Sequence, residues 1–245
     1  MASKTWFITG ASSGLGRAFA EHALGRGHNV VATARRVDAL ADIAARAPER
    51  VLALALDVTR PEDARAAVDA AAARFHRIDV LINNAGYGIV GAFEETSDDA
   101  LRAQMETNFF GAMNVIRAAL PYLRKSKSPR IVNIASTEAL GATALHSPYS
   151  AAKAGVTGLT RSLAVELGRD GITVNCICPG PIRTAITDRI SEEHKTIYAR
   201  RRTALGRYGD PEEVAHMTLS LCLPAASFLT GAVIPVDGGL MARNA

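Results

Sequence analysis

Three residues of this sequence have the types and the spacing for proton transfer to and from an oxygen atom. Tyr149 and Lys153 are four residues apart at the start of a predicted helix, so their side chains lie on the same face. An ammonium group beside a phenol favours the phenolate and lowers the tyrosine pKa from about 10. A tyrosine with a lowered pKa exchanges protons near neutral pH. A Tyr-x-x-x-Lys spacing is common, however, and on its own it is usually structural.

Ser136 is the third candidate. It follows the fifth predicted strand, at the carboxyl edge where open α/β sheets bind ligands. Its hydroxyl is placed to hydrogen-bond a substrate oxygen. Together the three side chains predict a site that polarises an oxygen and supplies a proton to it.

A glycine-rich turn near the N-terminus is a candidate phosphate site. It follows the first predicted strand and opens the first helix, as phosphate binding requires. Glycines allow the sharp turn and let a phosphate approach the helix N-terminus, where free N–H groups and the positive end of the dipole lie. The alternative is an ordinary tight turn between a strand and a helix. The candidate residues are Gly10, Ser12, Ser13, Gly14, Leu15 and Gly16.

The residues after the second predicted strand indicate which dinucleotide is bound. A cofactor without a 2′-phosphate usually meets a carboxylate here, which accepts from the ribose hydroxyl. This chain has Arg35 and Arg36 instead, and two guanidinium groups can pair with a 2′-phosphate. The sequence therefore favours NADP(H), with NAD(H) still possible. The alternative is that both arginines begin a solvated helix.

Two further turns lie at the same predicted sheet edge. Asp57 and Val58 follow the third strand, where a carboxylate can accept from an adenine amino group or cap a turn. Asn84, Ala85 and Gly86 follow the fourth strand. The asparagine can bond backbone groups while the two small residues leave room for a ligand. A structural role and a contact with the cofactor ribose both remain open.

The elements that must position these residues alternate along the chain. Apolar, β-rich runs are separated by alanine-rich helical stretches, and most of the strands are apolar nearly throughout, as strands buried on both faces are. This pattern predicts an α/β fold: residues 1–245 form a single doubly wound, Rossmann-type catalytic domain, with helices on both faces of a seven-stranded, mostly parallel sheet. The predicted strands are 6–9, 29–34, 51–56, 80–82, 130–134, 173–177 and 233–236, and the predicted helices include 16–25, 61–75, 98–123, 151–167 and 211–221.

Composition excludes several classes of protein. Hydrophobic residues make up 48% of the chain and charged residues 21%, which excludes global disorder. The net charge is +4, but the basic runs at 124–130 and 200–207 contain no aromatic residues for base stacking. We therefore expect solvated helix faces there and no nucleic-acid partner.

Cysteines and hydropathy bear on compartment and metals. Three cysteines make no disulfide framework, and no Cys-x-x-Cys motif or histidine cluster predicts a metal. Cys176 and Cys178 share one face of a strand as small apolar groups. The first ten residues do not resemble a secretory signal, and the uncharged stretch 214–236 is predicted to form a helix, a loop and a buried strand. We expect a cytoplasmic protein with no membrane partner.

The complete, ordered set of motifs resembles the short-chain dehydrogenases/reductases from about Lys4 to Gly239. Each piece is weak alone, but the order and the thirteen-residue step from Ser136 to Tyr149 are specific. The motifs are Thr9-Gly10-x-x-x-Gly14-x-Gly16, Asn83-Asn84-Ala85-Gly86, Asn108, Ser136, Tyr149-x-x-x-Lys153 and Pro179-Gly180.

The resemblance implies a role for each motif. Tyr149 is the general acid/base, Lys153 lowers its pKa and holds the nicotinamide ribose, and Ser136 polarises the carbonyl. Asn108 binds a water that relays protons, unless it only marks a kink in the helix. Pro179 and Gly180 turn the chain over the nicotinamide, whose carboxamide is held by the Ile182 backbone and the Thr184 hydroxyl.

The implied reaction is hydride transfer between a nicotinamide cofactor and a small carbonyl or alcohol substrate. An NAD(H)-dependent alcohol, sugar or steroid dehydrogenase and a non-catalytic, dinucleotide-sensing regulator are the alternatives. The chain resembles the steroid and retinol branch up to Asn108 and the ketoacyl and sugar branch from Tyr149, so the substrate stays open.

Two expectations concern the region outside the catalytic residues. Residues 185–207 are expected to form a substrate lid, or else an amphipathic helix packed on the body. Relatives are commonly tetramers, so a homo-oligomer, tetramer or dimer, is expected. Its contacts would involve residues 98–123, 151–167 and the C-terminal strand.

Overall fold

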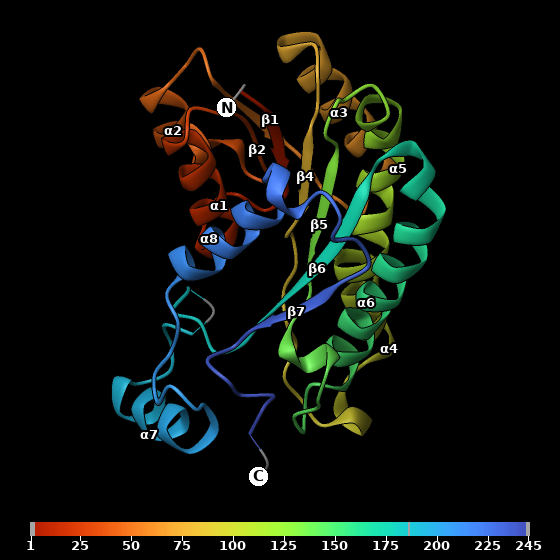
Figure 1. Cartoon of the computed structure of the whole chain (residues 1–245). Helices are drawn as coiled ribbons and strands as arrows, with labels where there is room; N and C mark the ends of the chain where they lie inside the picture. Colours follow the sequence, from red (N-terminus) through yellow and green to blue (C-terminus); the bar gives the residue numbers. More distant parts are fainter. Residues whose placement is uncertain (1–2, 186, 244–245) are drawn as a thin grey trace.

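The computed structural model describes residues 3–185 and 187–243. Seven parallel strands form one sheet in the order β3-β2-β1-β4-β5-β6-β7 (Figure 1). Five of them, β1, β2, β4, β5 and β6, are buried along nearly their whole length, as expected of strands covered on both faces. The strands are β1 (Thr5–Ile8), β2 (Asn29–Ala34), β3 (Val51–Ala55), β4 (Val80–Asn83), β5 (Arg130–Ile134), β6 (Thr173–Pro179) and β7 (Val233–Val236).

Helices cover both faces of this sheet. On one face α1 packs against α8, and on the other α3 packs against α5, with α6 beside it (Figure 1). The predicted doubly wound α/β fold is therefore confirmed. The helices are α1 (Gly14–Gly25), α2 (Ala41–Arg46), α3 (Pro61–Phe75), α4 (Asp98–Met105), α5 (Gly111–Leu123), α6 (Ser147–Leu167), α7 (Glu192–Arg202) and α8 (Pro211–Leu221).

The strand order reverses beside β1, and this reversal creates the ligand-binding edge. Ile8 of β1 lies opposite Ala32 of β2 on one side and Ile82 of β4 on the other. The loops after β1 and β4 therefore diverge to opposite faces of the sheet. A crevice opens at such a switch point, outside the carboxyl ends of the strands.

One predicted helix is wrong in an informative way. Residues 98–123 do not form a continuous α-helix, because a π-helical turn, Glu106–Phe110, separates α4 from α5. The π turn holds Asn108, whose buried side-chain amide bonds the backbone of Tyr87. Single π turns of this kind are frequent at functional sites.

Strand β7 also departs from the prediction. It was expected to be buried, but it is the edge of the sheet and its residues are half-exposed or exposed. Across the described ranges, no helix combines the length and the apolar composition needed to cross a membrane. The same ranges contain no group of three or more His, Cys, Asp or Glu side chains suited to hold a metal ion.

Candidate active site

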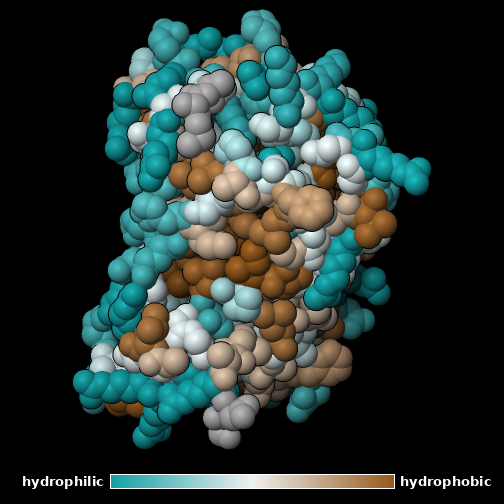
Figure 2. Space-filling view, viewed as in Figure 1, coloured by the Kyte–Doolittle hydropathy of each residue, from teal (hydrophilic) through white to brown (hydrophobic). Residues whose placement is uncertain are grey.

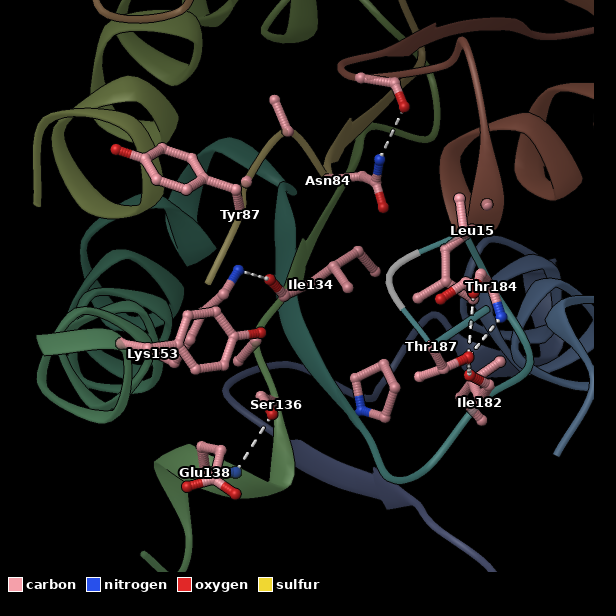
Figure 3. Close-up of a pocket in the computed structure, with 18 of the residues that line it drawn as sticks. Leu15, Asn84, Tyr87, Ile134, Ser136, Glu138, Lys153, Ile182, Thr184 and Thr187 are labelled. Atoms are coloured by element: carbon pink, nitrogen blue, oxygen red, sulfur yellow. Dashed lines mark hydrogen bonds between the residues drawn. The ribbon is translucent and has the colours of Figure 1, made fainter. Parts of the chain in front are cut away.

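A crevice of about 780 Å³ runs along the carboxyl ends of the strands. Its walls come from the segments that follow β1 to β6, together with α6 and α7 (Figure 3). Most of the predicted site residues line it. They are Gly10, Ser12, Ser13, Gly14, Leu15, Arg35, Asp57, Val58, Asn84, Ala85, Gly86, Ser136, Tyr149, Lys153, Pro179, Gly180, Ile182 and Thr184. Gly16, Arg36 and Asn108 are not in this lining.

The glycine-rich turn is built by close backbone approach. Gly10 adopts a φ of 67°, and a Cβ at this position would lie 2.9 Å from the Ala85 Cα. A Cβ at Gly16 would lie 2.1 Å from the Gly10 carbonyl oxygen, so only glycine fits there. Helix α1 begins at Gly14 with no acidic residue in its first turn. These features fit a pyrophosphate at the helix N-terminus.

Asn84 braces this turn from the neighbouring strand. Its Nδ2 donates to the carbonyl oxygens of Thr9 at 2.9 Å and Gly10 at 3.1 Å (Figure 3). The Thr9 hydroxyl in turn accepts from the backbone N–H groups of Asn84 and Ala85. Of the two roles that the sequence left open for Asn84, the structure shows the structural one.

Arg35 and Arg36 take different positions. Both are exposed, but only Arg35 lines the crevice, whereas Arg36 precedes the 3₁₀ turn Val37–Leu40. Burial favours the neutral form of the Asp57 carboxyl. Hydrogen bonds from Thr59 and the charge of Arg35 outweigh it, and the pKa of Asp57 is lowered. Asp57 is thus an ionised turn residue within the electrostatic reach of Arg35.

Tyr149 and Lys153 lie in the first turns of α6, as predicted. The Lys153 Nζ lies 5.7 Å from the centroid of the Tyr149 ring. It donates to the carbonyl oxygen of Ile134 at 2.8 Å (Figure 3). Burial lowers the pKa of Lys153 to about 8.

The predicted lowering of the Tyr149 pKa is wrong for this structure. Burial of the phenol raises its pKa above the ordinary value, the Ser136 hydroxyl opposes this only in part, and the Glu138 carboxylate adds to it. Lys153 directs its ammonium group to the Ile134 carbonyl instead. The phenol is therefore protonated at neutral pH, which is the form of a proton donor.

Ser136 follows β5 and opens the 3₁₀ turn Thr137–Ala139. Its Oγ accepts from the Glu138 backbone N–H at 3.1 Å, which leaves the hydroxyl proton for another oxygen (Figure 3). The Glu138 carboxylate accepts from the backbone and hydroxyl of Thr143 and from the Ser150 hydroxyl. Glu138 thus ties the loop after β5 to the first turn of α6, beside Tyr149.

Asn108 holds the chain after β4 rather than facing the crevice. Its Nδ2 donates to the Tyr87 carbonyl at 2.8 Å, and its Oδ1 accepts from the Tyr87 N–H at 3.1 Å. Gln104, which the sequence does not identify, makes a parallel pair of bonds to Tyr87 and Ile89. The only signal for it was its four-residue spacing from Asn108 on a helix.

Thr187 is a second residue that the sequence did not identify. Its hydroxyl donates to the carbonyl oxygens of Ile182 at 3.0 Å and Thr184 at 2.9 Å, and accepts from the Thr184 N–H (Figure 3). The Thr184 side chain also faces the glycine turn, because a Cβ on Gly14 would lie 3.5 Å from the Thr184 Cβ. Thr187 therefore fixes the turn that closes one side of the crevice.

The segment expected to form a lid contributes one wall of the crevice. Ile190, His194 and Tyr198 line it, facing the side that holds Tyr149 and His146. Residue 186, in the same expected lid, lies outside the described residues. Glu192, in the first turn of α7, pairs with Arg183 at 2.7 Å and with the buried Lys195 at 2.8 Å.

Comparison with known proteins agrees with this geometry. A protein-family model described as enoyl-(acyl carrier protein) reductase matches residues 10–241. The chain is 38% identical to meso-2,3-butanediol dehydrogenase of Serratia marcescens, over 99% of this chain and 96% of that protein. It is 35% identical to 3-oxoacyl-[acyl-carrier-protein] reductase of Thermotoga maritima, over 97% of this chain and 98% of that protein.

Two solved structures superpose over almost the whole chain. Aldohexose dehydrogenase of Thermoplasma acidophilum matches with a TM-score of 0.91 and 32% identity, covering 99% of this chain and 95% of that one. A short-chain type dehydrogenase/reductase of Mycobacterium marinum matches with a TM-score of 0.92 and 30% identity, covering 99% and 97%. The chain is an oxidoreductase of the carbonyl and CH–OH class, and it belongs to the short-chain dehydrogenase/reductase family.

Proposed function

We propose that this protein is an NADP(H)-dependent carbonyl reductase that interconverts a ketone or aldehyde with the corresponding alcohol. The observation that carries the proposal is the meeting of Tyr149, Lys153 and Ser136 at one end of a crevice whose other end holds the glycine turn and Arg35. Neither a phosphate site nor a proton donor alone would require both ends.

The residues of the crevice fit a dinucleotide. The glycine turn and the N-terminus of α1 would hold the pyrophosphate, and Arg35 would pair with a 2′-phosphate. Asp57 and Val58 would meet the adenine, while Ala85, Gly86 and Lys153 would meet the nicotinamide ribose. The backbone at Pro179, Gly180 and Ile182 and the Thr184 side chain would hold the carboxamide. When bound and reduced, the cofactor supplies the hydride that the carbonyl carbon accepts.

The chain's own contribution is to position and polarise the carbonyl. The Ser136 hydroxyl donates a hydrogen bond to the carbonyl oxygen, and the Tyr149 phenol gives that oxygen its proton. The raised pKa of Tyr149 keeps the proton on the phenol at neutral pH. In the oxidative direction the phenolate takes the proton back, so alcohol oxidation should be favoured by alkaline pH.

The relatives support a carbonyl or alcohol substrate without naming one. The substrates in their names are a butanediol, an oxoacyl carrier protein and an aldohexose, which share a secondary alcohol or a carbonyl and little else. An NAD(H)-dependent dehydrogenase is the second candidate function. It is supported by the exposure of Arg35 and Arg36 and by the dehydrogenase names among the relatives.

The remaining expectations belong to the same proposal. We propose that the chain works as one catalytic unit, with residues 185–207 as a substrate lid. The cytoplasm stays the expected compartment, since Cys176, Cys178 and Cys222 are buried free thiols. A homo-oligomer stays the expected assembly.

The test is a panel of ketones and aldehydes with NADPH or NADH, in which turnover is measured from the absorbance of the cofactor. We expect turnover with NADPH, and Tyr149→Phe should cut kcat by about 10²- to 10⁴-fold while leaving the NADPH Kd nearly unchanged. Retention of most activity by Tyr149→Phe would refute the role of the phenol. Tight NADPH binding with no turnover of any substrate would favour the dinucleotide-sensing regulator.

A further inference from the structure

The chain that leaves β4 passes directly along the candidate catalytic pair. We name residues 86–89, which follow Asn84 and Ala85, the strap. A Cβ on Gly86 would lie 3.4 Å from the Lys153 Nζ, and a Cβ on Gly88 would lie 3.7 Å from the Tyr149 ring. The strap thus sets one side of the space in which both side chains sit.

The strap has no regular secondary structure of its own to fix it. Its backbone is held instead by two buried amide side chains from the helix that faces it. Gln104 Nε2 donates to the Tyr87 carbonyl at 2.6 Å, and Gln104 Oε1 accepts from the Ile89 N–H at 2.9 Å. Asn108 makes the corresponding bonds to the carbonyl and the N–H of Tyr87.

The two amides hold different parts of the strap. Asn108 holds a single residue, Tyr87, which follows Gly86. Gln104 bridges from Tyr87 to Ile89, so it spans Gly88, the residue on which a Cβ would lie 3.7 Å from the Tyr149 ring. Gln104 comes from α4 and Asn108 from the π turn that follows it. The irregular helix therefore presents both amides to one short segment.

We propose that Gln104 is a positioning residue of the reaction: by bridging Tyr87 and Ile89 it holds Gly88 beside the Tyr149 ring and so fixes where the phenol meets the substrate oxygen. Gln104 is not itself among the residues that line the crevice, so it acts only through the strap. This inference rests on the proposed function, because it assigns Gln104 to the proton transfer made by Tyr149.

Replacing the amide changes the strap in a predictable way. In Gln104→Met, whose side chain is of similar length, the Ile89 N–H loses its hydrogen-bond acceptor. The Tyr87 carbonyl still accepts a hydrogen bond from Asn108. Gln104→Glu retains an oxygen for the Ile89 N–H and loses the donor to Tyr87. Because a displacement of about 1 Å can cost 10²-fold in rate, we expect Gln104→Met to lower kcat by roughly 10- to 100-fold.

A matched control separates positioning from loss of stability. Asn175 is a buried amide on β6 that makes the same pair of bonds, to the Leu229 carbonyl at 2.8 Å and from the Ala232 N–H at 3.1 Å. It lies near the start of β6, whereas the end of β6 lines the crevice. Asn175→Leu should therefore lower the melting temperature comparably and leave kcat within about twofold.

The experiment measures kcat, the KM for a ketone, the NADPH Kd and the melting temperature for the wild type and the three variants. We expect kcat to fall in Gln104→Met and recover at least partly in Gln104→Glu, with the NADPH Kd changed less than about threefold. Equal kcat values for Gln104→Met and Asn175→Leu would overturn the proposal. So would a fall in kcat matched by an equal fall in folded fraction.

Hydrogen exchange tests the inference independently of turnover. The Ile89 amide should exchange faster in Gln104→Met and not in Asn175→Leu, because only the first variant removes its acceptor. If the wild type turned over no carbonyl substrate, the proposed function would fail whatever the strap does. If the wild type is active and Gln104→Met leaves both the Ile89 amide and kcat unchanged, only the inference about Gln104 fails.

Discussion

At the scale of single residues, the protonation state of Lys153 should change with pH. Burial lowers its pKa to about 8, so the ammonium form dominates below pH 8 and is lost as the pH rises through that value. Because we propose that this ammonium group donates to the cofactor ribose, we expect the protein to bind NADPH less well above pH 8. We expect the NADPH Kd, measured by fluorescence titration, to rise severalfold between pH 7 and pH 9.5.

A variant without the charge supplies the control for this titration. Lys153→Met, a side chain of similar length, should bind NADPH with a weak affinity that does not change over the same range. A wild-type Kd that is equal at both pH values would contradict the assignment of Lys153 to cofactor binding.

The choice between the two arginines is a second residue-scale prediction. Arg35 lines the crevice and acts on the Asp57 carboxylate, whereas Arg36 lies outside the lining. Arg35→Ser should weaken NADPH by about 10- to 100-fold, which is the scale of one or two charge-assisted hydrogen bonds, and leave NADH almost unaffected. Arg36→Ser should have the smaller effect on NADPH. Equal Kd values for NADPH and NADH in the wild type would leave no phosphate site for either arginine.

What sequence reasoning missed at this scale shares one physical cause. Tyr149, Lys153 and Ser136 were predicted because their chemistry is carried by residue type and spacing. The direction of the Tyr149 pKa was not, because it depends on how deeply the fold buries the ring. Gln104 and Thr187 bond main-chain groups of other segments, and those segments become neighbours only in the folded chain.

At the scale of elements, hydrophobic pattern predicted the sheet well. β2, β5 and β7 begin and end at the predicted residues, and the same holds for α3 and α8. The break between α4 and α5 was not predictable from the pattern, since the apolar period continues across it. A close tertiary contact follows the break: Gly111 packs so closely on Val58 that a Cβ would lie 2.6 Å from the Val58 Cγ2.

Helix α7 and the turn before it form the element on which the lid proposal depends. Glu192 bonds both the exposed Arg183 and the buried Lys195. The exposed pair contributes little, but loss of Glu192 leaves the Lys195 ammonium buried without this partner. We expect Glu192→Gln to loosen α7 and raise the ketone KM severalfold, with the NADPH Kd unchanged. Steady-state kinetics and direct titration measure the two effects.

A compensating change separates this effect from simple loss of charge at the surface. Adding Lys195→Met to Glu192→Gln removes the stranded ammonium and should bring the ketone KM back toward the wild-type value. If the double variant has the same KM as Glu192→Gln, the buried lysine is not the cause.

At the scale of the whole molecule, the exposed apolar face bears on assembly. Figure 2 shows apolar side chains gathered over β7, the half-exposed edge of the sheet. Nearby, Val165 of α6 is 85% exposed and Phe228, before β7, is fully exposed at 102%. The two segments run close together, because a Cβ on Gly231 would lie 3.4 Å from the Ala164 Cβ. Apolar surface of this kind typically marks an interface.

Because two-fold contacts between identical subunits use the same patch on each subunit, a charge placed on this face is repeated across such a contact and opposes association. We therefore expect the wild type to sediment as a dimer or tetramer at micromolar concentration, and Val165→Glu with Phe228→Ser to shift it toward the monomer. Val37→Glu, at another exposed valine in the 3₁₀ turn that follows Arg36, should leave the sedimentation coefficient unchanged. A wild type that is monomeric at these concentrations, or a double variant that associates as well as the wild type does, would show that this face is not the contact.

Dissociation should also affect stability more than activity. Strand β6 pairs with β7, and its carboxyl end lines the crevice, so this face lies one strand away from the crevice. We therefore expect dissociation to lower the melting temperature more than it lowers kcat for the enzyme that stays folded.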